Sequence, residues 1–385
     1  MSGANGFVGR HVIHKLLEQK DTSNEQVIIC LVRPEKIQYE ALYWCAATEE
    51  MQSNVCIKFM PYDMLDDGST LSDALECGIQ YSSSTKECPI CIYHIASVFG
   101  PTADPIITAK NNVKSTENAV RALDKFYQQH PNIKPRLVIT SSMAAVRATD
   151  QTPLNGKWYT HKDWNTLSKL NMKNWGSCYQ WSKAESERVA WEMVKECNER
   201  YAKEDDDGMT KKKIEMVALN PSFVFGPPPP LPLKMKDTTA KSAGSSSYSL
   251  TLIKQWLKGE STVQSRLCGD VRDVASAHVV AGTIDLDELP GDDTDRRYIL
   301  STEERLSSEL TAQALINGVE QAGGSKSIDI SKITCDTDFS GGAIKIGDRE
   351  VEASDRLKHD LGVVFRPVEE TMCDMAKALL QEDSY

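Results

Sequence analysis

The chain begins MSGANGFVGRHVIHKLLEQ (residues 1–19), and its first nine residues hold three glycines, Gly3, Gly6 and Gly9. Apolar residues then recur at helical spacing as far as about Lys20, so the glycine turn opens an amphipathic helix. Such a turn lets backbone amides approach a diphosphate, and the positive end of the helix points at it. We therefore expect a dinucleotide site here, contacted by Gly3, Asn5, Gly6, Phe7, Val8 and Gly9.

Short apolar runs rich in β-branched residues follow this helix, and each predicts a buried parallel strand. The runs lie at residues 26–33, 55–63, 90–97, 136–142 and 214–222. Helical patterns separate them, most clearly over 104–129 and 179–202. Alternating strands and helices predict an α/β fold with a doubly wound parallel sheet.

Only Met1 and Ser2 precede the glycine turn, where a sheet of this kind has its first strand. That strand is central, so its truncation leaves backbone groups of two neighbouring strands unpaired. Even five such buried groups, at roughly 1–3 kcal/mol each, would offset a total stability of about 5–15 kcal/mol. We therefore expect the natural protein to begin several residues upstream. Native protein whose mass begins at Met1 would contradict this expectation.

The strand and helix pattern loosens in the C-terminal part of the chain. A segment rich in proline and serine (224–249) predicts a long mobile loop, and 285–297 predicts an acidic linker. In GDVRDV, Asp270, Arg272 and Asp273 are expected to form a structural ion pair with a helix cap. We expect a dinucleotide-binding domain over 1–222, with 263–283 packing back on it, and a smaller substrate-binding lobe over 223–262 and 284–385.

The nature of the cofactor is indicated at the ends of two predicted strands. Arg33 ends the first of them, at a place where a carboxylate binds a ribose 2′-hydroxyl and an arginine suits a 2′-phosphate. Lys36 adds a second positive charge, so NADP(H) is favoured over NAD(H). Asp63, after the next strand, either accepts from the adenine amino group or caps the next helix. We count it, with Met64, among the cofactor contacts.

The candidate catalytic residues lie on a helix and at a strand end. YQWSK places Tyr179 and Lys183 four residues apart, so both project from one face of a helix. An ammonium near a phenol lowers the pKa of the tyrosine, which suits proton transfer near neutral pH. Ser142 ends a predicted strand, where open parallel sheets bind their ligands. Together these residues predict a carbonyl-reduction site, and we expect no metal.

Six segments in register, GANGFVG, the Arg33 position, TSSMAAV, YQWSK, NPSFVFGP and DVRDVASAH, resemble the extended short-chain dehydrogenases/reductases of the NAD-dependent epimerase/dehydratase superfamily. The resemblance looks nearest to dihydroflavonol reductase, cinnamoyl-CoA reductase and the fungal methylglyoxal reductases. It implies that Tyr179 protonates the substrate oxygen, Lys183 holds the nicotinamide ribose and Ser142 orients the carbonyl. It also implies cofactor contacts from Ala96, Ser97, Pro221, Ser222 and Val224.

The resemblance and the residues together predict an NADPH-dependent oxidoreductase that reduces an aldehyde or ketone to an alcohol. Alternatives are a 3β-hydroxysteroid or sterol-type dehydrogenase, a nucleotide-sugar epimerase or dehydratase, and a non-catalytic dinucleotide-binding protein. Arg33 opposes the epimerases, which generally retain NAD⁺. Tyr179 and Lys183 oppose the non-catalytic class, whose members typically lack both residues.

Composition limits the partners of this chain. Its 44 Lys and Arg against 55 Asp and Glu give a formal net charge of −11, which argues against nucleic acid or an anionic membrane as partner. No run approaches the roughly 18 apolar residues of a membrane span, and no secretory signal accompanies the 11 cysteines. We therefore expect a cytoplasmic protein, monomeric or homodimeric, that acts on a small molecule.

Overall fold

The computed structural model describes residues 1–19, 26–53, 55–80, 90–204, 213–235, 247–292, 295–324, 328–336 and 349–381. Within them the strands are β1 (Val27–Val32), β2 (Cys56–Pro61), β3 (Ile90–His94), β4 (Pro135–Thr140), β5 (Glu215–Pro221), β6 (Phe223–Phe225), β7 (Cys268–Asp270) and β8 (Arg297–Leu300). The helices are α1 (Phe7–Glu18), α2 (Ile37–Met51), α3 (Ser69–Gln80), α4 (Pro105–Gln129), α5 (Met143–Val146), α6 (Trp175–Glu204), α7 (Tyr248–Lys258), α8 (Val271–Thr283), α9 (Ser308–Gln321), α10 (Ser354–Leu361) and α11 (Val368–Gln381).

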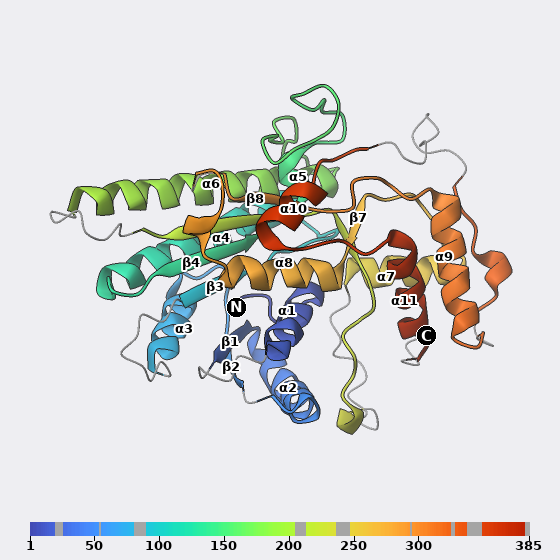
Figure 1. The fold of residues 1–385 in the computed structure, drawn as a ribbon, viewed down its shortest axis with the longest axis horizontal. Helices are drawn as coiled ribbons and strands as arrows, with labels where there is room; N and C mark the ends of the chain where they lie inside the picture. Colours follow the sequence, from blue (N-terminus) through green and yellow to red (C-terminus); the bar gives the residue numbers. More distant parts are fainter. Residues whose placement is uncertain are drawn as a thin grey trace.

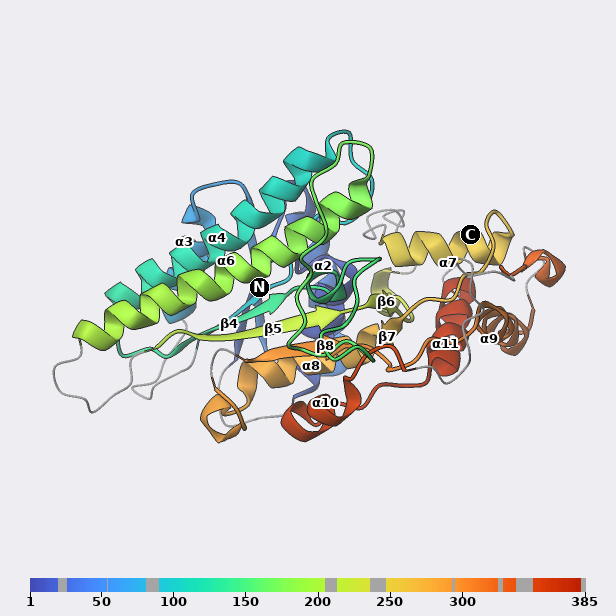
Figure 2. The ribbon, with the colours of Figure 1, turned by 90° about the horizontal axis from the view of Figure 1, so that it is seen from above.

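Parallel strands form the central layer, with helices on both faces (Figure 1). On one face α4 and α6 pack side by side over β4 and β5, whereas α8 covers the opposite face (Figure 2). Each helix turns its apolar stripe to the sheet, so a buried cluster lies on either side of the strands. The predicted doubly wound α/β fold is therefore confirmed.

Met1 and Ser2 lie between β1 and β3, in the central position of the sheet. The amide of Leu31 donates to the carbonyl of Met1 at 2.8 Å, and the amide of Ser2 donates to the carbonyl of Tyr93 at 3.0 Å. Ser2 also forms parallel bridges with Leu31 and with His94. The predicted truncated first strand is thus represented by these two residues, which join β2–β1 to β3–β4–β5–β8. The predicted upstream start stays a prediction.

The strand β8 was not predicted. It has only four residues and begins where the acidic segment 285–297 ends, so the sequence has no long apolar run there that would predict a strand. In the structure it pairs in parallel with β5, with Ala218 opposite Arg297 and Pro221 opposite Leu300. Part of the predicted substrate-binding lobe therefore supplies a strand to the dinucleotide-binding sheet. The predicted domain boundaries otherwise stay a prediction.

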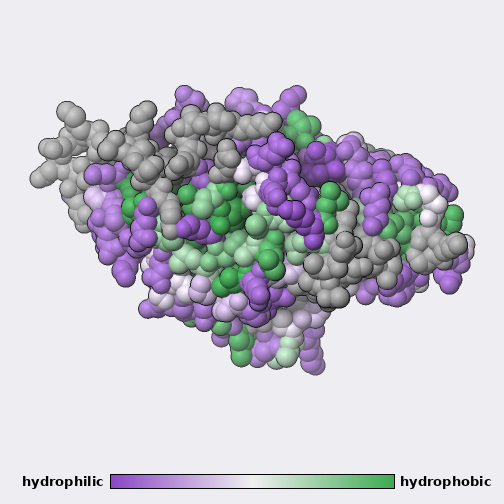
Figure 3. Space-filling model, turned by 90° about the horizontal axis from the view of Figure 1, so that it is seen from below, coloured by the Kyte–Doolittle hydropathy of each residue, from purple (hydrophilic) through white to green (hydrophobic). Residues whose placement is uncertain are grey.

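A second buried cluster lies away from the main sheet, where α7, α9 and α11 pack together (Figure 1). Its largest buried side chains are Phe225, Trp256, Leu315 and Met375. On the face shown in Figure 3, hydrophobic side chains gather toward the middle, with hydrophilic side chains bordering them. Among the described helices, none combines the length and the apolar character needed to cross a membrane.

Within the predicted mobile loop (224–249), residues 226–235 lie on α2, whereas 224–225 belong to β6 and 248–249 to α7. The hydroxyl of Tyr43 donates to the carbonyl of Pro230 at 2.9 Å, and Lys234 pairs with Glu49 at 2.5 Å. These contacts tie the proline-rich part of the segment to the helix, because proline stiffens the chain and leaves its carbonyls free to accept. Residues 226–235 thus contact α2, the mobility of the loop stays a prediction, and 236–246 lie outside the described residues.

The GDVRDV motif has the structural role that the sequence predicts. Asp270 caps α8 by accepting from the amide of Arg272 at 2.8 Å, and its carboxylate pairs with the Arg272 guanidinium at 2.7 Å. Arg272 also pairs with Asp374 on α11 at 2.9 Å, and Asp273 pairs with Arg366. The motif therefore fastens α11 to the first turn of α8.

The glycine turn provides a test of the fold. A Cβ on Gly9 would lie 2.2 Å from the carbonyl oxygen of Gly3, so we expect Gly9→Ala to lower the free energy of unfolding by about 1–3 kcal/mol. Gly78→Ala in α3 is the matched control, since its Cβ would meet only the Ile29 side chain at 3.7 Å. We expect Gly78→Ala to raise the free energy of unfolding by about 0.5–1 kcal/mol. Urea unfolding measures both, and a Gly9 variant as stable as the parent would contradict this account.

Candidate active site

The glycine turn lies at the carboxyl edge of the sheet, against the segment that follows β3. Gly3 adopts φ +68°, and a Cβ there would come within 2.8 Å of the Ala96 amide nitrogen. Gly6 donates to the carbonyl of Gly3 at 2.9 Å and immediately precedes α1. The hydroxyl of Ser97, next in sequence to Ala96, is buried without a hydrogen-bond partner among the described residues. A turn free of side chains, at a helix N-terminus, fits the diphosphate of a dinucleotide.

The predicted 2′-phosphate contacts follow β1 at the same edge. Arg33 directly precedes the short helix η1 (Pro34–Lys36), and its side chain is 68% exposed. Its guanidinium lies 3.4 Å from the carboxylate of Glu35. An exposed guanidinium with a single loose partner keeps most of its donors available for a phosphate. Lys36 ends the same short helix, so both positive charges stay close together.

Asp63 and Met64 follow β2, beside Arg33 at the sheet edge. The carboxylate of Asp63 accepts from the amide of Leu65 at 2.9 Å, within the turn after the strand. Asp66, rather than Asp63, accepts from the amide of Thr70 at the start of α3. The alternative in which Asp63 caps the helix is therefore wrong. Met64 packs against a buried cluster below the edge.

Ser142, Tyr179 and Lys183 come together at the carboxyl end of β4. Ser142 precedes α5, its hydroxyl accepts from the amide of Ala144 at 3.1 Å, and it lies close enough to Tyr179 to act on the pKa of the phenol. Tyr179 and Lys183 lie one turn apart on α6. The Lys183 ammonium donates to the carbonyl of Thr140 at 2.9 Å and lies 5.9 Å from the centroid of the Tyr179 ring. The structure thus assembles the three predicted residues, and their catalytic roles remain a proposal.

The pKa of Tyr179 departs from the sequence expectation. Burial raises it to about 12, against the opposing effect of the hydrogen bond to Ser142. Burial also lowers the pKa of Lys183 to about 8, against the opposing effect of the Glu187 carboxylate. The expected lowering of the tyrosine pKa is therefore wrong here, because desolvation of the phenolate dominates. Near neutral pH the phenol carries its proton.

The predicted nicotinamide segment adjoins this trio. Pro221 ends β5, and its carbonyl accepts from the hydroxyl of Ser142 at 3.4 Å. The hydroxyl of Ser222 lies 2.8 Å from that of Ser301, just beyond β8. Val224 continues into β6. The segment therefore lies beside Ser142, as a contact to the reacting end of the cofactor requires.

A buried carboxylate behind the trio was not predicted. Glu187 lies one turn after Lys183 on α6, and its side chain is fully buried. It accepts from the hydroxyl of Ser141 at 2.5 Å and from the amide of Asn220 at 2.6 Å, and it pairs with Arg297 at 2.5 Å. These contacts fix α6 to β4, β5 and β8. The four-residue spacing from Lys183 was visible in the sequence, but the partner Arg297 lies on the strand that was missed.

Aromatic side chains flank the candidate catalytic tyrosine. The ring of Phe99 lies 4.6 Å from that of Tyr179, 5.6 Å from that of Trp175 and 5.1 Å from that of Tyr248. Phe99 is 40% exposed, so this aromatic cluster opens to solvent. An apolar wall beside a proton donor suits the uncharged part of a substrate. The three residues come from distant segments and share no sequence pattern.

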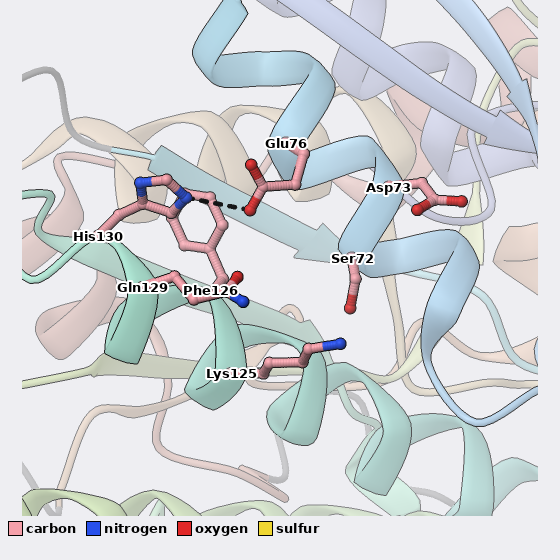
Figure 4. A pocket seen from close by; sticks show the side chains of 7 residues that line it. All are labelled: Ser72, Asp73, Glu76, Lys125, Phe126, Gln129 and His130. Carbon is pink, nitrogen blue, oxygen red and sulfur yellow. Dashed lines mark hydrogen bonds and ion pairs between the residues drawn. The ribbon is translucent and has the colours of Figure 1, made fainter.

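A separate hollow of about 430 Å³ lies between α3 and the end of α4 (Figure 4). Across it, His130 and Glu76 are 3.0 Å apart. Its lining consists of Ser72, Asp73, Glu76, Lys125, Phe126, Gln129 and His130. None of the predicted site residues lines it, so the predicted chemistry lies elsewhere, at the sheet edge.

The glycine turn, the doubly wound sheet and the serine, tyrosine and lysine at one edge define the class of short-chain dehydrogenases/reductases. Residues 1–201 match the family model described as Male sterility protein. The chain belongs to this family, within the NAD-dependent epimerase/dehydratase superfamily, and the predicted resemblance is confirmed.

Known proteins support the assignment. The chain is 30% identical over 295 residues to the NADPH-dependent methylglyoxal reductase Gre2 of Saccharomyces cerevisiae, which covers 73% of this chain and 72% of that protein. It is 31% identical over 202 residues to the cinnamoyl-CoA reductase CAD2 of Medicago truncatula, 49% of each chain. The structure of yeast methylglyoxal/isovaleraldehyde reductase Gre2 with NADPH aligns with a TM-score of 0.69 at 22% identity, covering 100% of this chain and 98% of that one.

The buried pair behind the site can be tested by stability. Arg297→Met leaves the carboxylate of Glu187 buried without its cation, so we expect a loss of about 3–5 kcal/mol in the free energy of unfolding. The double variant Glu187→Gln/Arg297→Met removes the unpaired charge and is expected to recover part of that loss. As a control, Lys15→Met breaks the exposed pair with Glu18 and should cost less than about 1 kcal/mol. Urea unfolding of Arg297→Met indistinguishable from the control would refute this role.

Proposed function

We propose that this protein is an NADPH-dependent oxidoreductase that reduces an aldehyde or ketone to an alcohol. The observation that carries the proposal is the placement of Ser142, Tyr179 and Lys183 at one sheet edge, where the Lys183 ammonium donates to the carbonyl of Thr140 at 2.9 Å and lies 5.9 Å from the centroid of the Tyr179 ring. These residues share their sheet edge with the glycine turn. The printed names of the relatives, an NADPH-dependent methylglyoxal reductase and a cinnamoyl-CoA reductase, support both the cofactor and the carbonyl substrate.

The residues at the sheet edge fit NADP(H), which when bound supplies the hydride that the carbonyl carbon accepts. The glycine turn would hold the diphosphate, and Arg33 with Lys36 would hold the 2′-phosphate. Asp63 and Met64 would lie at the adenine end. The nicotinamide half would contact Ala96, Ser97, Pro221, Ser222 and Val224.

The chain's own residues would move the proton. Ser142, held by the amide of Ala144, orients the substrate oxygen toward Tyr179. With its pKa raised to about 12, Tyr179 is protonated near neutral pH and donates to the oxygen as negative charge develops there. An alkoxide is more basic than a phenolate, so this transfer is downhill. The positive charge of Lys183 stabilises the phenolate until solvent returns a proton.

Charge favours a small aldehyde or ketone over a CoA thioester as substrate. The phosphates of CoA need cations, and Lys234, the described lysine of the loop, pairs with Glu49 on α2. The alternative epimerase function would require retained NAD⁺, which Arg33 disfavours. A cytoplasmic location and a monomeric or homodimeric assembly remain predictions.

Replacing the proposed proton donor tests the function. Tyr179→Phe removes one hydroxyl, and we expect kcat for carbonyl reduction to fall at least about 100-fold. The Kd for NADPH, from fluorescence titration, should stay within about twofold. Tyr39→Phe on α2 is the control and should keep kcat. A Tyr179 variant with parental kcat would contradict the mechanism, and no turnover of any carbonyl by the parent would favour a non-catalytic protein.

The low pKa of Lys183 predicts a pH dependence. The ammonium is charged below its pKa of about 8, so kcat/KM for reduction should fall as pH rises through 8. Between pH 8 and the ordinary lysine value of about 10.4, the unfolded chain binds the extra proton. The contribution of Lys183 to stability therefore rises with pH over that window. Urea unfolding at several pH values should show that the free energy of unfolding of the parent rises over this window and that this rise is absent in Lys183→Met. The same pH dependence in both proteins would contradict the prediction.

A further inference from the structure

Arg266 lies between the nicotinamide segment and the aromatic cluster. Its guanidinium carbon is 5.0 Å from the centroid of the Phe223 ring, and Phe223 directly follows Ser222. It also interacts electrostatically with Tyr248, whose ring lies 5.1 Å from that of Phe99. A positive charge therefore lies on the side of the site that faces the substrate, away from the glycine turn.

The Arg266 guanidinium has fewer hydrogen-bond and charge partners among the described residues than its buried position calls for. Its Nε is buried without a hydrogen-bond partner, and among described residues its side chain donates to the neutral amide of Gln264. Three other partly buried arginines have carboxylate partners: Arg272 pairs with Asp270, Arg305 with Glu350 and Arg349 with Glu303. No carboxylate of the described residues makes such a pair with Arg266. Asp336 attracts the guanidinium electrostatically but forms no ion pair with it. Burying a cation without a paired counter-charge costs free energy, which a bound anion would recover.

The aromatic cluster determines what kind of anion would fit. Phe99, Trp175 and Tyr248 offer ring surfaces beside Tyr179, and Tyr248 interacts electrostatically with Arg266. Such surfaces bind uncharged, flat groups. A ligand that reaches both ends therefore needs a carbonyl at one end, an apolar middle and a negative charge at the other. A planar carboxylate matches the forked donors of a guanidinium.

We propose that Arg266 binds a carboxylate on the substrate, so that the preferred substrates are apolar or aromatic aldehydes and ketones with a carboxylate at the far end. This inference rests on the proposed function, since it assigns the substrate of the same site. Arg266 acts in it as a specificity-determining residue and takes no part in the proton transfer.

A matched pair of substrates tests the proposal. We would measure kcat/KM with NADPH for 4-formylbenzoate and for its methyl ester, which has the same ring and aldehyde without the charge. The parent is expected to favour the acid. Arg266→Met keeps a long side chain over Phe223, and it should lower the ratio of acid to ester at least 10-fold, mainly through KM for the acid. Arg266→Lys, which keeps the charge, should retain part of the preference.

The controls separate this inference from the function on which it rests. Arg121→Met removes an exposed cation of α4 that pairs with Glu117, and the ratio should not change. Turnover of both substrates with the same ratio in the parent and in Arg266→Met would overturn the inference and leave the reductase function standing. If neither substrate is turned over, the kinetic ratio cannot be measured, and the reductase function is judged separately by the Tyr179 experiment with other carbonyls. Calorimetry with 4-(hydroxymethyl)benzoate then decides: Arg266-dependent binding supports the carboxylate site, and its absence refutes it.

Discussion

The backbone of Ser2 holds the two parts of the main sheet together. It bridges Leu31 on β1 and His94 on β3, its side chain is fully buried, and its hydroxyl contacts the ring of His94 and accepts from the amide of Ala96. The glycine turn begins at the next residue. Because these bonds fix where the turn starts, they place the N-terminus of α1 against the segment after β3 and next to the other carboxyl ends of the strands.

The same edge explains how the charges of the site are arranged. Lys183 and Glu187 are both buried on α6, and Arg297 supplies a counter-charge to the carboxylate from β8. The ion pair of Glu187 with Arg297 lies behind the phenol and keeps α6 in register with the sheet. Arg266, on the substrate side, makes no ion pair with a carboxylate of the described residues, although Asp336 attracts it electrostatically. A bound anion would supply the paired charge that this guanidinium lacks.

Local patterns were enough to predict the strands β1 to β5, the helices between them and the trio Ser142, Tyr179 and Lys183. Each depends on a short apolar run or on a helical spacing that the sequence shows directly. The strand β8 and the pair of Glu187 with Arg297 were missed, because they form through contacts between distant segments. The predicted direction of the Tyr179 pKa shift was wrong for a related reason: burial, which the sequence does not show, raises this pKa.

The central claim is that this sheet edge binds NADPH through the glycine turn and Arg33. Fluorescence titration of the full chain with NADPH and with NADH, in the parent and in Arg33→Ser, tests it most directly. The account predicts tighter binding of NADPH than of NADH, and a preference that Arg33→Ser reduces by about 10-fold or more, as expected for loss of a charged hydrogen bond. Equal binding of the two cofactors by the parent, or a preference that survives in Arg33→Ser, would contradict it.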